Sequence, residues 1–323
     1  MKLVCPLCTG ELSPREQAYE CPRCAREYPV VCGIPDFRLW PDPFIGIEED
    51  RRKGALLAEA GRSRGFREML DYYYSITPEN PPDLAGRWKD HAIAAVDLAR
   101  AVLAEASLVN GSALLDLGCS TGGLLIAASG GWTSLAGVDV AFRWLVIASI
   151  RLREAGVQAR LVCANAEALP FPPAAFDTVA AIDLLEHLRD PPSAARQARR
   201  VLVPGGRALW ESNNRYAAAP EPHVRLWGVG YLPRRWQGRY VGWRRNDPHP
   251  YRIRLPGPRE MDRLLEEAGF RNCRTEAAGL FAPHSKHRGL HMALSGYNRV
   301  RRVPVIRELA TWFGPRLSAR ADG

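Results

Sequence analysis

The stretch at residues 114–123, LLDLGCSTGG, decides the fold expected for this chain. An apolar run ends at Asp116, a turn with three glycines follows, and an apolar, helix-like stretch begins at Leu124. This order of strand, tight turn and helix directs backbone N–H groups and a helix N-terminus toward a ligand. Glycines suit the turn because a side chain would block close approach of the ligand and because some positions need φ > 0. The stretch therefore predicts a ligand-binding turn in an α/β fold.

A second apolar stretch, residues 135–140 (LAGVDV), also carries an acid at its end, Asp139. An acid at the end of the second strand, about 20 residues beyond the turn, is placed to accept hydrogen bonds from ribose hydroxyls. Strand-like and helix-like stretches alternate along this region, which predicts a parallel sheet with ligands at the carboxyl ends of its strands. The expected strands are residues 113–117, 134–138, 159–163, 178–182 and 208–212.

Four motifs resemble, in order, those of the class I S-adenosylmethionine-dependent methyltransferases: DLGCSTG, GVDVA, ANAEALPFPPAAFDTVAAIDLLEHL and VLVPGGRALW. The resemblance covers residues 112–210 and implies a methyltransferase with a Rossmann-like sheet, mostly parallel with an antiparallel last strand. It also implies that the first acid and the turn hold the methionine end of the cofactor, that the second acid holds the ribose, and that Asn165 faces the adenine amine. The residues implied to bind S-adenosyl-L-methionine are Asp116, Gly118, Ser120, Gly122, Asp139, Asn165, Ala166 and Asp183.

Two positions depart from the family pattern. Ser120 replaces the middle glycine of the usual GxGxG, which makes the turn more constrained, and Asn165 replaces the usual aspartate at the adenine. The amide oxygen of Asn165 can still accept a hydrogen bond from an exocyclic amine, so cofactor binding is expected. The alternative is a nucleotide-binding fold that has lost its ligand.

The N-terminal region contains two C-x2-C pairs, Cys5/Cys8 and Cys21/Cys24, separated by twelve residues. This spacing predicts a four-cysteine structural zinc site, whose metal supplies the folding energy that so small a module lacks. The module resembles the zinc-ribbon proteins that assist tRNA- and protein-modifying methyltransferases, and the N-terminal ribbon of ribosomal RNA guanine methyltransferases. That resemblance implies a structural or docking role, with a protein as a partner.

Three polar residues, Asp183, Glu186 and His187, follow the fourth expected strand, in AIDLLEHLRD. A histidine at this position can take a proton from the acceptor as a general base. The D-x-x-E-H spacing resembles the E-x-x-E-H of ubiquinone-biosynthesis O-methyltransferases, which implies a divalent cation at these three residues. A structural role for His187 is the third interpretation. The segment ESNNRY resembles the segment after the sheet in the same enzymes, which implies acceptor contacts by Asn213, Asn214 and Arg215.

Composition and charge limit the classes of protein that fit. Hydrophobic residues make up 46% and charged residues 24% of the 323 residues, as in globular proteins, and no apolar run is long enough to span a bilayer. The first residues lack the apolar core of a secretory signal, so a cytoplasmic location is expected. The net charge is +9, and residues 196–260 carry fourteen arginines against four acids. That basic segment forms either a solvated face or a surface for RNA phosphates or anionic head groups.

Four regions are expected along the chain: a zinc ribbon at 1–40, a linker with N-terminal helices at 41–110 that can serve as a lid, a methyltransferase domain at 111–300, and a helical tail at 301–323. An insertion at 214–258 carries aromatic residues among arginines, which suit either stacking on bases or glycans or a small satellite core. Residues 270–275 and 290–295 are expected to form the closing antiparallel strand pair.

Taken together, the motifs favour an enzyme that transfers a methyl group from S-adenosylmethionine to an oxygen of a small-molecule or lipid-linked acceptor. Two alternatives stay open. The ribbon and the basic insertion also suit methylation of an RNA base. A non-catalytic adapter that binds S-adenosylmethionine and activates a partner through its ribbon is the second alternative.

Overall fold

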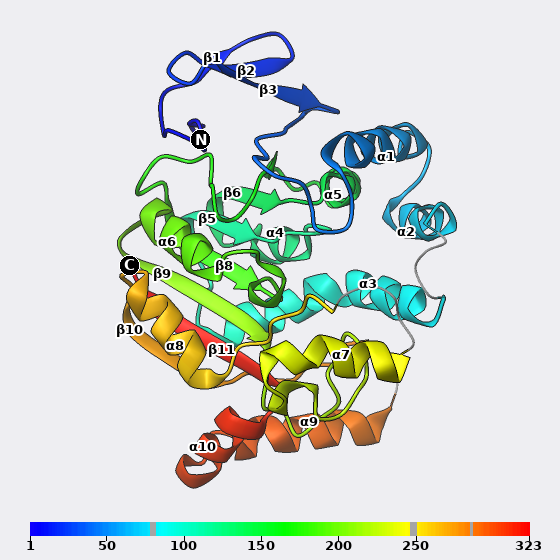
Figure 1. Ribbon diagram of the computed structural model, residues 1–323, viewed down its shortest axis with the longest axis vertical. Helices are drawn as coiled ribbons and strands as arrows, with labels where there is room; N and C mark the ends of the chain where they lie inside the picture. Colours follow the sequence, from blue (N-terminus) through cyan, green and yellow to red (C-terminus); the bar gives the residue numbers. More distant parts are fainter. Residues whose placement is uncertain (78–81, 246–250, 285–286) are drawn as a thin grey trace. The chain divides into compact units, whose positions relative to one another are not determined.

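The computed structural model describes residues 1–77, 82–245, 251–284 and 287–323 (Figure 1). The chain divides into two units. The first contains Met1–Val179 and Arg200–Gly206, and the second contains Ala180–Arg199 and Arg207–Gly323. The turn at residues 117–123 belongs to the first unit, and the acid–histidine segment at 183–187 belongs to the second.

The first unit begins with a small antiparallel sheet. Its strands follow one another in chain order: β1 (Ser13–Pro14), β2 (Ala18–Cys21), β3 (Arg26–Val31) and β4 (Ile34–Pro35). Tyr28 on β3 is buried and lies against Phe37, with ring centroids 4.8 Å apart. Tyr19 also lies against Phe37, and Leu3, Val4 and Ile34 are buried. A core of this size is small, so the module depends on further stabilisation.

Three parallel strands form the centre of the first unit: β5 (Gly111–Leu117), β6 (Trp132–Asp139) and β7 (Arg160–Cys163). Helix α4 (Gly123–Ala128) connects β5 to β6, and α5 (Phe142–Glu154) connects β6 to β7. The strands expected at 113–117, 134–138 and 159–163 are confirmed. β8 (Phe176–Ile182) starts beside β5, because the Asp177 carboxylate accepts a hydrogen bond from the Ala113 N–H at 3.1 Å.

The small sheet is joined to the parallel strands. The Phe37 N–H donates to the carbonyl of Cys163 on β7 at 2.7 Å, and Asp36 forms a parallel bridge with the same residue. Three helices follow: α1 (Ile47–Ala60), α2 (Phe66–Ser75) and α3 (Pro82–Glu105). The sequence expectation of helices in the 41–110 region is confirmed, and both α1 and α2 contact α5.

A buried ion cluster attaches α1 to α5. The Asp50 carboxylate is fully buried and accepts hydrogen bonds from Arg38 Nη1 (2.7 Å), Arg143 Nη1 (3.0 Å) and the Phe142 N–H (2.8 Å) at the start of α5. Arg38 also pairs with buried Asp36, and Arg143 with buried Asp42. These buried charges are paired, as burial of ions requires.

Asp50→Ala is therefore expected to lower the free energy of unfolding by about 3–5 kcal/mol, because it leaves two buried guanidinium groups short of a partner. Urea unfolding followed by circular dichroism measures the change. The matched control is Glu48→Ala on the same helix, whose exposed carboxylate pairs with Arg51 and whose loss should cost less than about 0.5 kcal/mol. Equal losses in the two variants would contradict the importance of the buried cluster.

The second unit contains three antiparallel strands. β11 (Arg316–Asp322) pairs with β9 (Leu202–Asn213) on one side and with β10 (Arg271–Ala277) on the other. The expected antiparallel last strand is confirmed. The helices that carry residues of this unit are α6 (Pro191–Val201), α7 (Arg234–Arg245), α8 (Pro258–Glu267), α9 (Arg288–Val300) and α10 (Pro304–Phe313), with short 3-10 helices at Leu185–His187 and Val229–Tyr231.

Two expectations for the C-terminal region are wrong. Residues 290–295 lie inside α9 rather than in a strand, since Leu, Met and Ala favour helix and the stretch lacks β-branched residues. The tail at 301–323 is not wholly helical, because α10 ends at Phe313 and β11 follows. In β11 the small apolar residues Leu317, Ala319 and Ala321 alternate with polar ones and are buried, which is the period of a strand.

Candidate functional site

The turn after β5 is held against the end of β6. The N–H groups of Gly118 and Cys119 both donate to the carbonyl of Val138, at 2.8 and 3.0 Å. Gly118 and Gly122 have φ values of 75° and 73°, in the left-handed region that glycine adopts without strain. Ser120 also lies there, at φ 44°, in the position where the sequence predicted a constrained turn.

The two acids at the strand ends lie in different hydrogen-bonding environments. The Asp139 carboxylate accepts hydrogen bonds from the N–H groups of Ser120 (2.9 Å) and Ala141 (2.8 Å), which fixes its orientation at the turn. Burial raises its pKa to about 6, and these two N–H groups oppose the shift. Burial, together with the charge of Asp139, raises the pKa of Asp116 to about 8. Burial therefore makes both carboxyls harder to ionise than exposed aspartates, and Asp116 more so than Asp139.

Asn165 lies directly after β7 and is buried. Its Oδ1 accepts hydrogen bonds from the N–H groups of Leu39 (2.9 Å) and Trp40 (3.4 Å), and its Nδ2 donates to the carbonyl of Trp40 (3.2 Å). Ala166 follows in the same turn and is also buried. The carboxamide thus holds the segment that leaves the N-terminal sheet, a contact the sequence analysis missed, and its role at adenine stays a prediction.

In the second unit, Glu186 and two histidines form a cluster. One ligand atom from each of Glu186, His187 and His223 lies within 4.8 Å of the other two. Glu186 is fully buried, and its carboxylate accepts hydrogen bonds from Ser212 Oγ (2.8 Å) and Asn213 Nδ2 (3.0 Å). Glu186, His187 and Asn213 therefore lie close together in the structure.

The two histidine rings face each other edge to face, with centroids 5.1 Å apart, and differ in their surroundings. His187 keeps an exposed surface, yet the loss of water around its ring lowers its pKa, and His223 adds to this effect. Burial alone would lower the pKa of His223, but the hydrogen bond and charge of Glu221 outweigh it and raise the pKa. His223 Nδ1 lies 2.6 Å from the Glu221 carboxylate, so Nε2 is the ring nitrogen outside this hydrogen bond. His187 is thus the more readily neutral ring, as a base or a metal ligand must be.

Asp183 is not part of this cluster. Its carboxylate pairs with Arg316 on β11, with Nη1 at 2.9 and 3.0 Å from its two oxygens, and Arg316 also lies 3.4 Å from Glu211. Burial acts to lower the pKa of Arg316, but the charges of the two acids raise it. Asp183 also has a φ of 53°, a strained value for aspartate. Among the described residues, the group close enough to hold a cation here is Glu186, His187 and His223, and Asp183 is not part of it. The cation expected at Asp183, Glu186 and His187 stays a prediction.

Asn214 and Arg215 have structural contacts instead of facing the cluster. The Asn214 carboxamide donates to the carbonyls of Thr311, Trp312 and Gly314 and so caps the end of α10. The Arg215 guanidinium donates to the Gly230 carbonyl at 2.7 Å and pairs with Glu260 at 3.3 Å. Of the three expected acceptor contacts, Asn213 is the one that touches Glu186.

Sequence reasoning missed Glu221, His223 and Arg316. Glu221 and His223 lie in the insertion, and Arg316 lies in the tail expected to be helical. No spacing rule connects them with Glu186, because all three are distant in sequence. The Glu-x-His pair at 221–223 was the one local signal, since a carboxylate beside a histidine often orients it.

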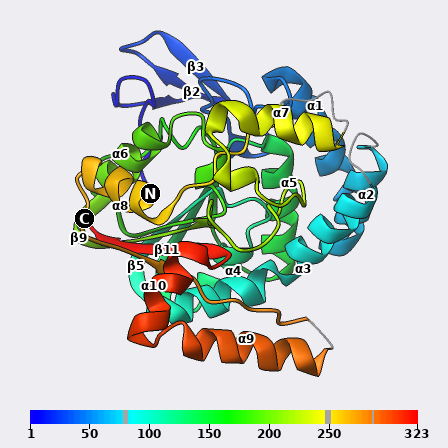
Figure 2. The same cartoon turned by 60° about the horizontal axis from the view of Figure 1, so that its bottom comes forward.

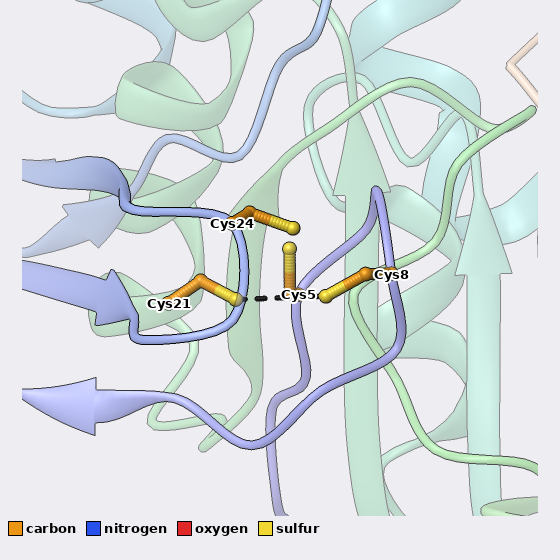
Figure 3. A group of neighbouring side chains, drawn as sticks. All are labelled: Cys5, Cys8, Cys21 and Cys24. Atoms are coloured by element: carbon orange, nitrogen blue, oxygen red, sulfur yellow. Dashed lines mark hydrogen bonds between the residues drawn. The ribbon is translucent and has the colours of Figure 1, made fainter.

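The four N-terminal cysteines come together as expected (Figure 3). Their sulfurs lie within 4.8 Å of one another, and Cys8 Sγ lies 3.5 Å from Cys21 Sγ. A tetrahedral zinc site with Zn–S distances of about 2.3 Å requires sulfurs about 3.8 Å apart, so the arrangement fits this metal. Cys5 Sγ also lies 3.2 Å from the Tyr28 hydroxyl, which ties the site to the small aromatic core.

Comparison with known proteins identifies the central segment. Residues 115–210 match the family model described as a methyltransferase domain. Similar proteins include the ubiquinone biosynthesis O-methyltransferases of Idiomarina loihiensis (29% identical, covering 50% of this chain and 62% of that protein) and Paracidovorax citrulli (36% identical, covering 34% and 48%). A solved S-adenosylmethionine-dependent methyltransferase from Mesorhizobium loti is 21% identical, with a TM-score of 0.47 over 70% of this chain and 96% of that one.

The chain spans about half the length of the curated relatives it matches. The residues that match the family model include the glycine turn, the two acids and the acid–histidine segment, and they end in β9. Residues 115–210 of this chain match the methyltransferase domain family, and this chain is similar to ubiquinone biosynthesis O-methyltransferases over part of its length.

Proposed function

We propose that this protein transfers a methyl group from S-adenosylmethionine to an oxygen of a small-molecule or lipid-linked acceptor. The observation that carries the proposal is the cluster of Glu186, His187 and His223, directly after the fourth strand of a methyltransferase domain. The similarity to ubiquinone biosynthesis O-methyltransferases supports oxygen as the methylated atom and a phenolic or catecholic acceptor.

In this proposal the first unit holds the cofactor. The Asp139 carboxylate, already fixed by two backbone N–H groups, accepts hydrogen bonds from the ribose hydroxyls. The turn at Gly118, Ser120 and Gly122 provides close backbone approach, and Asp116 balances the positive charge at the methionine end. Asn165 and Ala166 line the adenine side. The methyl group is then transferred in line from the sulfonium to the acceptor oxygen.

His187 prepares the acceptor. A methyl group on a sulfonium is attacked by an electron-rich oxygen, so the acceptor hydroxyl must lose its proton as the new bond forms. His187 is exposed and favours the neutral state, so its ring can take that proton. Glu186 and Asn213 hold the segment in place, and orientation of the acceptor in the site provides much of the remaining acceleration.

The same cluster fits a divalent cation. Two imidazoles and one carboxylate are the donor set of many catalytic zinc sites and also suit manganese or iron, and the Glu221–His223 hydrogen bond is of the type that orients a metal-bound histidine. Glu186, His187 and His223 would hold the ion. A cation there would lower the pKa of an acceptor hydroxyl by stabilising its anion. Zinc at Cys5, Cys8, Cys21 and Cys24 is proposed as structural only.

Calorimetry and a methyl-transfer assay together test the proposal. We expect purified protein to bind S-adenosylmethionine and its demethylated product, and to transfer a tritiated methyl group to 3,4-dihydroxybenzoate or to a long-chain alkyl catechol. Asp139→Ala should weaken cofactor binding about 10–100-fold, because charged hydrogen bonds to the ribose are lost. Glu59→Ala, which removes an exposed acid of the same unit, is the matched control. Absence of cofactor binding would overturn the proposal; binding without turnover on any acceptor would favour the adapter alternative.

Cofactor affinity is expected to rise with pH. Asp116 and Asp139 have raised pKa values, about 8 and about 6, and only their ionised forms attract the cationic cofactor. Affinity should therefore increase by about tenfold or more from pH 6 to pH 8.5 and then level off, with protons released on binding. Calorimetry in buffers of different ionisation enthalpy measures both effects. Asp116→Asn should flatten the profile above pH 7, and an unchanged profile in that variant would assign the dependence to another group.

One surface favours RNA as a second candidate acceptor. On α7, Trp236, Arg239, Tyr240 and Trp243 recur at the spacing of one helix face, and Trp243 is 75% exposed. Exposed aromatic rings beside arginines suit stacked bases and phosphates. Binding to transfer RNA or ribosomal RNA that weakens steeply with salt, together with methylation of that RNA, would favour this candidate over the small-molecule acceptor. Residues 246–250 of the insertion lie outside the described residues.

A further inference from the structure

Helix α10 presents an apolar face to solvent. This α10 face consists of Val303, Val305, Ile306, Leu309 and Phe313. Val305 is 76% exposed and Leu309 is 58% exposed, and neither α9 nor α10 contains a buried residue. In both views of the ribbon, α10 begins close to the end of α9 (Figures 1 and 2). Contiguous apolar surface of this kind on a folded chain usually marks an interaction site.

The orientation of α10 is the reverse of an ordinary surface helix. The side that faces the rest of the second unit carries polar residues beside one large ring: Thr311 Oγ1 accepts a hydrogen bond from the Ala277 N–H at 3.3 Å, Arg307 lies 4.0 Å from Glu276, and the Trp312 ring lies 6.0 Å from that of Tyr216. The residues at 305, 309 and 313, spaced by one helical turn, face outward. A helix that packed only for stability would bury this side, so the apolar side is available to another surface.

Charge indicates which surface fits. Residues 287–313 contain five arginines and a single acid, Glu308. Arg288, Arg299 and Arg302 are exposed, on α9 and at its end. An apolar stripe flanked by arginines is the pattern of helices that lie in the interface of an anionic bilayer. A second copy of the chain fits less well, because it would bring two positively charged faces together. Among the described residues, no helix has the length and apolar character to traverse a bilayer.

We propose that the α10 face binds the surface of anionic lipid bilayers, with α10 lying parallel to the membrane and its apolar side chains among the acyl chains. The exposed Arg288, Arg299 and Arg302 contact the lipid phosphates. This inference does not depend on the identity of the methyl acceptor, because it rests on the surface of the second unit alone.

Vesicle flotation with the full-length protein tests the inference. The probes are vesicles of phosphatidylcholine alone and vesicles containing an equal share of phosphatidylglycerol, at low and high salt. We expect binding to the anionic vesicles only, weakened at least about tenfold by high salt. The double variant Val305→Asp/Leu309→Asp should lose at least about tenfold in partitioning, as it places charge in the acyl region. Phe44→Asp, which removes an equally exposed ring from the first unit, should bind like the wild type.

A second variant controls for the possibility that the first one misfolds. Arg299→Gln/Arg302→Gln leaves the apolar face intact and changes only exposed charge, so it should fold normally and bind anionic vesicles at least about tenfold more weakly. Without lipid, the wild type and the Val305→Asp/Leu309→Asp variant should sediment alike, because the α10 face is not expected to mediate self-association. Equal binding to both vesicle types, unchanged binding by both variants, or self-association lost in the α10 variant would each overturn the proposal.

Discussion

His187→Ala is expected to lower kcat for methyl transfer to a catechol by about 10²–10⁴-fold, the range that a positioned general base contributes. The ring is exposed, favours the neutral state, and directly follows a buried carboxylate, so it is the group in the cluster best suited to accept a proton. The Kd for S-adenosylmethionine should stay within about twofold, because the cofactor-binding acids are on other strands. Single-turnover measurement of methyl transfer, with calorimetry for the cofactor, gives both quantities.

One further variant separates the general-base interpretation from the metal interpretation. His223→Ala removes a proposed metal ligand and leaves His187 in place. If a cation activates the acceptor, His187→Ala and His223→Ala should lose both bound metal and activity to a similar degree. If His187 acts as a base without metal, His223→Ala should retain most of the turnover. Full turnover by His187→Ala with a true acceptor would remove both roles from this residue.

The sequence predicted best those features that depend on residues close together in the chain. The strands β5 and β6, the turn between β5 and α4, and the two acids at the strand ends are set by apolar runs and glycines that lie within a few residues of one another. The four cysteines were also predictable, because metal coordination requires a fixed set of ligands at a short spacing. These features locate the glycine turn and the four-cysteine cluster without knowledge of long-range contacts.

The rest of the site depends on contacts between distant residues. His223 and Glu221 come from an insertion, and Arg316 comes from a strand that sequence analysis assigned to a helix. Each reaches the 183–187 segment through tertiary packing, for which no local pattern exists. The bond of Asn165 with the backbone of Leu39 and Trp40 is similar, because a carboxamide that suits an adenine amine also suits a peptide group.

The strand β11 shows that secondary structure, too, can depend on contacts between distant residues. Its seven residues, RLSARAD, contain few large apolar side chains and several charges, so propensity alone does not favour a strand. The strand forms because it fills the space between β9 and β10, and the resulting hydrogen bonds decide its conformation. Arg316 at its start then pairs with Asp183, which withdraws that acid from the expected metal site.

Removal of zinc is expected to unfold the N-terminal sheet. Structural zinc contributes on the order of 10 kcal/mol to small metal-dependent modules. Here the four sulfurs are accompanied by only a small apolar core, which includes Tyr28, Ile34 and Phe37. Cys21→Ser should therefore eliminate bound zinc, measured by metal analysis, and expose residues 1–40 to proteolysis. Cys32→Ser is the matched control, because Cys32 is an exposed cysteine of the same module outside the cluster.

Loss of zinc should also change the affinity for S-adenosylmethionine. The segment after the small sheet binds Asn165 through Leu39 and Trp40, and Phe37 binds the carbonyl of Cys163 at the end of β7. Unfolding of the sheet would free this segment, so Cys21→Ser should change the Kd for S-adenosylmethionine by several-fold, whereas Cys32→Ser should not. A zinc-free variant with intact protease resistance and unchanged cofactor affinity would show that the module folds without metal and acts independently of the cofactor. In the opposite case, the ribbon supports the edge of the sheet where the nucleoside is proposed to bind.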